Sequence, residues 1–363
     1  MSLLDFTSLT YAFGRLAGAA RFASPEIRRV ASLANVASAW RAYRRDAGAG
    51  DVGPAHQPSS DPGSILMTDD PRRDAVVLWL AAHGVPPIAD AATMVVRMVN
   101  ATRGFEVDAL ALLNAAEDAL AQAAAGGPLT GACGLADAGP DHPLHGLARA
   151  AVAVDVLIRA PDFAESSGHE ALLPLPSRSM RHYVASEPAG CWALNLVLVA
   201  RGIVPPVTGI VPRTVFRLDV TDAQRAAALV DHSTHEALAA FTNLERIESV
   251  LARGRDALVG LSRNARAFEA WTLLAALGPT TRKQLMRALG LSRAGADIQA
   301  RALAAARLVG LETGGLVSPA LPGSSPSPSA SLDHGPLCAA AADLDIAMAE
   351  IDRLLTRGLD KRN

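Results

Sequence analysis

The sequence predicts a mainly α-helical protein with a short β-hairpin near its C-terminal end. Half of the 363 residues are apolar, which is enough for a sizeable core, whereas only 4% are aromatic. Small side chains of high helix propensity, alanine above all, favour packed helices over a β-sandwich. In several segments apolar residues also recur three or four positions apart, which is the period of an α-helix.

The N-terminal part is expected to be helical and to be interrupted by one linker. Residues 1–46 alternate apolar residues with arginines at helical spacing, and the stretch 47–64, rich in glycine and proline, is a linker by composition. Asp70-Pro71 then marks a helix start, because proline suits the first helical position. Within an α-helical domain that spans 65–262, helices are predicted at 72–83, 90–100, 107–124 and 145–159.

The rest of this domain is less regular. Residues 160–190 are loop-rich, and a short helix is expected around Ser179 to Ala185. The apolar run Cys191 to Val211 is broken by Arg201 and two prolines, so it predicts a buried helix followed by a turn. Thr214 to Leu218 is expected as a short strand or an extended connector, and a long helix capped by Thr221-Asp222 is expected to run to about Leu261.

Residues 263–317 predict a separate domain in the order helix, helix, tight turn, helix, hairpin. Thr281 and Gln284 form a capping-box pattern that opens a helix over 282–289. Gly290-Leu291-Ser292 gives a three-residue turn, in which Ser292 caps a helix from Arg293 to about Arg307. Two apolar arms around Gly314-Gly315 predict the hairpin.

The run from Gln284 to Ala294, with Leu303 and Leu308-Val309 following at the right distance, resembles a bacterial winged helix-turn-helix of the MarR type. The resemblance covers about 55 of the 363 residues. It implies that the helix beginning at Arg293 lies in the DNA major groove and that the hairpin forms a wing near the backbone. The long helical region before this module also resembles uncharacterised rhizobial plasmid-type helix-turn-helix proteins.

Charge agrees with a nucleic-acid partner for this domain. Residues 253–320 contain ten basic and four acidic side chains, a balance of +6, so the remainder of a chain of net charge −2 carries −8. A basic region on an acidic body is typical of a DNA-binding domain. The candidate contacts to double-stranded DNA are Arg282, Lys283, Arg287, Ser292, Arg293, Gln299 and Arg301.

Four residues depart from the family pattern on the predicted recognition helix. Gly295 weakens the helix, and Asp297 faces phosphate with the wrong sign. Ile298 stands where a polar residue is usual, and Gln299 stands where an apolar core residue is usual. One alternative is a rotated helix that buries Ile298 and Ala302 and exposes Gln299. The function expected is that of a transcriptional regulator. The alternative is a non-enzymatic adaptor or structural protein whose winged helix binds another protein.

Other chemistry has little support in the sequence, and we expect no enzyme activity, no cofactor and no metal. His232 and His235 lie three apart on a helix, but no third ligand is identifiable, so a solvated polar face is the preferred interpretation. The three cysteines are far apart and odd in number, which excludes a disulfide framework and fits a reducing cytoplasm.

The C-terminal tail is expected to be a Pro/Ser linker at 318–336 followed by a helix over 337–363. An apolar stripe on this helix either docks on the protein's own body or joins two copies in a homodimer. Its members are Leu337, Ala341, Leu344, Met348, Ile351 and Leu355. No signal peptide and no membrane span are expected, so the predicted location is the cytoplasm.

Overall fold

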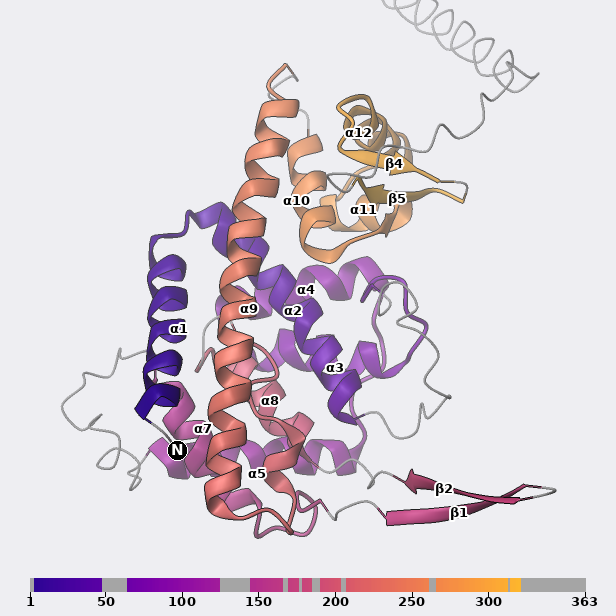
Figure 1. The fold of residues 1–363 in the computed structure, drawn as a ribbon. Helices are drawn as coiled ribbons and strands as arrows, with labels where there is room; N and C mark the ends of the chain where they lie inside the picture. Colours follow the sequence, from indigo (N-terminus) through magenta and orange to yellow (C-terminus); the bar gives the residue numbers. More distant parts are fainter. Residues whose placement is uncertain are drawn as a thin grey trace, which may run out of the picture. The chain divides into compact units, whose positions relative to one another are not determined.

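The computed structural model describes residues 3–47, 64–124, 144–165, 169–175, 178–184, 190–203, 207–260, 266–312 and 314–320. This part of the chain is mainly helical, as expected, with a small antiparallel sheet near its C-terminal end (Figure 1). Within it, no helix combines the length and the apolar character that a bilayer crossing requires.

The N-terminal segment forms two helices, α1 (Leu3–Phe22) and α2 (Pro25–Ala47). The second begins after Ser24, whose hydroxyl oxygen accepts a hydrogen bond from the Ile27 amide at 3.2 Å. Helix α2 is central, because it packs against α4, α8, α9 and α10, and its side chain Trp40 is completely buried. Helix α1 packs against α9.

Four of the predicted helices are present with bounds close to those expected. They are α3 (Arg72–His83), α4 (Pro86–Val99), α5 (Val107–Ala124) and α7 (His145–Leu157). Helix α4 begins four residues earlier than predicted, because Pro86 and Pro87 occupy its first turn, where a missing N–H costs nothing. Before α3, the Asp70 carboxylate accepts from the Arg72 amide at 2.9 Å, which satisfies one of the free N–H groups of the helix start.

The prediction of a short helix around Ser179 to Ala185 is wrong. Strands β1 (His169–Leu175) and β2 (Arg178–Val184) pair there as an antiparallel hairpin, in a register that places Leu175 opposite Arg178. The backbone partners of β2 come from β1, and this pairing overrides a local helical pattern.

The predictions for residues 191–218 are confirmed only in part. Helix α8 (Cys191–Ala200) is buried along its whole length, which confirms the predicted buried helix. In contrast, where a short strand or an extended connector was expected at Thr214 to Leu218, the chain forms a 3-10 helix, η2 (Arg213–Phe216), which buries Phe216. The preceding Pro212 carbonyl accepts from the Val215 amide and starts this turn, and only Arg217 is extended, where it bridges Glu165.

The long helix α9 (Asp222–Ala257) begins at the predicted cap, because Thr221 and Gln224 form a capping box. Its 36 residues correspond to about 54 Å. The described residues up to Pro319 belong to one compact unit, so the ranges 65–262 and 263–317 share a hydrophobic core. The predicted linkers 47–64 and 318–336 lie almost entirely outside the described residues, and the helix at 337–363 lies entirely outside them.

Candidate functional site

The residues from Arg266 to Ala320 fold as three helices and three short strands, which we call the C-terminal module. Its elements are α10 (Ala267–Leu277), β3 (Thr280–Thr281), α11 (Arg282–Leu289), α12 (Arg293–Ala305), β4 (Val309–Leu311) and β5 (Leu316–Pro319). The strands pair antiparallel in the order β3-β5-β4. Figure 1 shows this sheet beside α11 and α12.

Local sequence signals position α11 and α12 as predicted. The Thr281 hydroxyl accepts from the Gln284 amide at 3.2 Å, while the Gln284 side chain accepts from the Thr281 amide at 2.8 Å. Gly290 ends α11 in the left-handed conformation, with φ of 61°, which a residue with a Cβ adopts only at a cost. The Ser292 hydroxyl then accepts from the Gly295 amide at 3.1 Å and opens α12.

Helix α12 buries one face and presents the other to solvent. Ala296, Ala300 and Leu303 are buried against the module, whereas Ile298 is 62% exposed. The rotated helix that would bury Ile298 is therefore wrong, because burial of Leu303 fixes the opposite orientation. Gln299 lies at the edge of the buried face and is half-buried, with no hydrogen-bond partner at its Oε1 atom among the described residues.

Three of the predicted DNA contacts lie at the exposed face of α12, and an aspartate joins two of them. Asp297 forms ion pairs with Arg282 and with Arg301, both at 2.7 Å, and its own side chain is 21% exposed. The third, Arg293, is exposed in the first turn of α12, and Lys283 is exposed on α11, four residues before Arg287. Sequence reasoning identified Asp297 as a charge of the wrong sign, but its two arginine partners become apparent only when α11 and α12 are packed together.

Arg287, which was expected to contact phosphate, lies on a different side of α11. Its guanidinium donates to the Met98 carbonyl at the end of α4 at 3.3 Å, and the residue is half-buried. Nearby, the Gln284 amide donates to the Leu66 carbonyl at 2.7 Å, and the Ser64 hydroxyl donates to the Leu277 carbonyl at 2.9 Å. These three bonds attach the module to the helical body.

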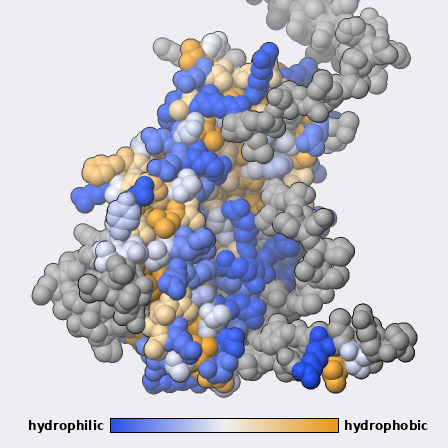
Figure 2. Space-filling view, viewed as in Figure 1, coloured by the Kyte–Doolittle hydropathy of each residue, from blue (hydrophilic) through white to orange (hydrophobic). Residues whose placement is uncertain are grey.

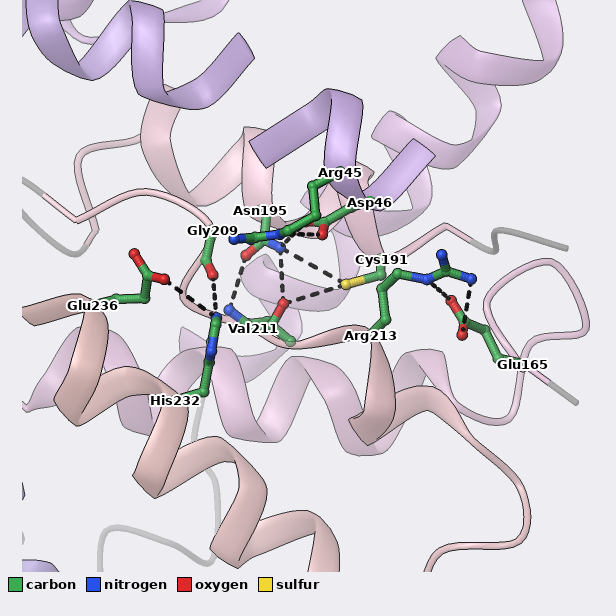
Figure 3. A network of polar contacts seen from close by, with 10 residues as sticks. All are labelled: Arg45, Asp46, Glu165, Cys191, Asn195, Gly209, Val211, Arg213, His232 and Glu236. Atoms are coloured by element: carbon green, nitrogen blue, oxygen red, sulfur yellow. Dashed lines mark hydrogen bonds and ion pairs between the residues drawn. The ribbon is translucent and has the colours of Figure 1, made fainter. Parts of the chain in front are cut away.

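A second cluster of polar side chains is buried in the helical body (Figure 3). Asp46, at the end of α2, is 2% exposed, and its carboxylate accepts from the Arg45 guanidinium and from the Asn195 amide, both at 3.0 Å. Asn195 also pairs with the backbone of Val211, as donor at 2.9 Å and as acceptor at 3.0 Å. The cluster therefore fastens the segment after α8 to the end of α2.

Cys191 belongs to this cluster and is completely buried. Its thiol donates to the Val211 carbonyl at 3.3 Å. Burial first, and then the negative charges of Asp46 and Glu165, raise the pKa of this thiol well above its usual value. A thiol that stays protonated and has no access to solvent is a poor nucleophile, so the geometry is that of a structural hydrogen bond.

The flanking charged groups of Figure 3 also make contacts within the fold. Arg213 pairs with the buried Glu165 at 2.9 Å. The His232 Nε2 atom forms a hydrogen bond with the Gly209 carbonyl at 2.8 Å, so the ring faces the backbone at Gly209 rather than His235. Among the described residues, no group of three or more histidine, cysteine or acidic side chains is arranged to hold a metal ion.

Comparison of the chain with protein-family models, with curated proteins and with solved structures gives no match. Figure 2 shows that, on one face of the molecule, apolar residues are scattered among hydrophilic ones.

Proposed function

We propose that the C-terminal module is a winged helix-turn-helix that binds double-stranded DNA, and that the protein is a transcriptional regulator of the cytoplasm. The observation that carries the proposal is the exposed face of α12, which begins at the Ser292 cap and presents Arg293 and Arg301. The order of the elements, three helices with β3 after the first and a hairpin after the third, is that of winged helices.

The charges on this face favour a polyanion. Arg282, Arg293 and Arg301 contribute three positive charges, and Asp297 removes one, which leaves +2. Phosphate contacts of this kind supply affinity without sequence preference. Arg293 leaves the first turn of α12, the part of such a helix that reaches base edges, where its planar fork suits guanine.

One observation favours the second candidate function, an adaptor whose module binds another protein. Ile298 lies in the middle of the exposed face of α12 and is 62% exposed. A central apolar side chain is typical of a protein interface. In the DNA complex, the same side chain would contact a thymine methyl group.

The test is duplex binding measured by fluorescence anisotropy between about 50 and 200 mM salt. Affinity is expected to fall steeply over this range through counterion release, whereas a flat response would refute DNA binding. On a selected site, Arg293→Ala is expected to cost about 1–3 kcal/mol and to relax preference at one base pair. Lys283→Ala is expected to weaken all sequences equally and to lower the salt slope by about one unit.

Arg103→Ala is the matched control, because Arg103 is an exposed arginine between α4 and α5. It is expected to leave the affinity and the salt slope unchanged. If Arg293→Ala lowers the affinities for the selected and a scrambled duplex equally, α12 does not read bases. If Ile298→Ala abolishes capture of a purified partner protein while duplex affinity is absent, the adaptor function replaces the regulator.

A further inference from the structure

A groove of about 640 Å³ lies between the N-terminal half of α2 and α4, in the helical body. Helix α2 contributes Arg28, Arg29 and the buried Leu33 to its walls, and α4 contributes Asp90, Met94 and Arg97. Sites for small molecules have volumes of roughly 300–1,000 Å³, so the groove is of sufficient size for a ligand.

The three arginines of the groove make no ion pair with any part of the chain that the structure describes. All three are exposed, and among the described residues none of their side chains forms an ion pair. Glu26, the acid nearest in sequence to Arg28, pairs with Arg255 instead. Asp90 is the one acidic side chain among the described residues that line the groove, so its walls carry a net charge of +2.

The groove also has an apolar side. Pro86 and Pro87 are exposed on its walls, and Met94 is half-buried. Methionine is flexible and adapts to irregular apolar ligands. A polyanion such as DNA would use the arginines but would gain nothing from this apolar surface, whereas a molecule with a charged head and an apolar chain would use both.

We propose that the groove between α2 and α4 binds a small single-chain amphiphile with an anionic head group. The guanidinium groups of Arg28, Arg29 and Arg97 hold the carboxylate or phosphate head, because their planar forks match these oxygens in paired hydrogen bonds. The chain lies along Pro86, Pro87 and Met94. This site is separate from α12, and its occupation does not depend on the DNA-binding function proposed above.

The test is isothermal titration calorimetry of the full chain with decyl phosphate, below the concentration at which it forms micelles. One saturable site per chain is expected. Arg28→Gln and Arg97→Gln are each expected to raise the Kd by roughly tenfold, since each removes a charge-assisted contact to the head group. Arg103→Gln is the matched control, because it removes an exposed arginine that does not line the groove.

Two further ligands separate the parts of the proposal. Decanol and inorganic phosphate are both expected to bind more weakly than decyl phosphate, since each lacks one of the two groups that the groove recognises. Equal binding by decanol would refute the role of the arginines, and equal binding by phosphate would refute the role of the apolar wall. Equal weakening by Arg103→Gln would show general charge attraction and overturn the site.

A steric variant gives an independent readout. Thr93 is exposed on the wall of the groove, so Thr93→Trp places a large side chain in the groove without disturbing the core. It is expected to abolish binding of decyl phosphate while the thermal unfolding temperature is unchanged. Unchanged affinity in a folded Thr93→Trp variant would place the ligand elsewhere and refute the proposal.

Discussion

Asp297 provides a test of the proposal that the exposed face of α12 contacts DNA. Its carboxylate lies 2.7 Å from both Arg282 and Arg301, so it opposes the charge of the two arginines that would contact phosphate. Asp297→Asn keeps the size of the side chain and raises the charge of the face from +2 to +3. We expect this variant to bind duplex DNA more tightly than the native protein.

The magnitude follows from the geometry. A phosphate on the far side of the Arg301 guanidinium lies about 7 Å from the Asp297 carboxylate, and at an effective dielectric constant of about 40 the repulsion is about 1 kcal/mol. Its removal corresponds to roughly a fivefold lower Kd. The two ion pairs are partly exposed, and such pairs contribute about 0–1 kcal/mol each to stability, so the variant is expected to fold.

Anisotropy titrations of a random duplex at several salt concentrations measure this change. The control is Asp108→Asn, an exposed acid in the first turn of α5 that alters the charge of the chain by the same amount. A gain in affinity for Asp297→Asn alone supports contact through α12. Equal affinities for the two variants and the native protein would refute the assignment of this face to DNA.

Three further outcomes are expected. If the apolar stripe of the tail joins two copies, deletion of residues 336–363 is expected to convert a dimer into a monomer in sedimentation, whereas an unchanged mass with lower thermal stability would show that the stripe docks on its own chain. Gly254→Ala is expected to lower the free energy of unfolding in urea by about 1–3 kcal/mol, because the added Cβ would overlap the buried indole of Trp271. Gly260→Ala is the control, because the space around its added Cβ is open. Burial raises the pKa of the Asp46 carboxyl above its usual value of 3.8. The folded state therefore binds the carboxyl proton more tightly than the unfolded state does. The stability that this proton contributes is lost as the pH rises from 3.8 through the folded pKa. We therefore expect the unfolding free energy of the native protein, measured relative to that of Asp46→Asn, to fall over this pH range. A difference that stays constant with pH would contradict the prediction.

Elements with local signals could be predicted from the sequence, whereas those that depend on distant partners could not. The capping boxes at Thr221 and Thr281 and the cap at Ser292 use residues three positions apart, and all three are present. Strand β2 depends on pairing with β1, and a local pattern suggested a helix there. The position of Arg287 depends on a carbonyl 189 residues away, which no spacing along α11 indicates.

The contacts of α11 constrain how the proposed DNA contact would be made. Helix α11 has eight residues, about 12 Å, and two side chains one turn apart attach it to the body: Gln284 to the Leu66 carbonyl and Arg287 to the Met98 carbonyl. These two attachments, together with the packing of α11 against α4, fix the position of the helix relative to the body. Because α12 packs against α11, its exposed face has a fixed direction relative to α4. Entry of α12 into a major groove would therefore place the helical body at a set position along the duplex, so the body determines where a second copy can bind.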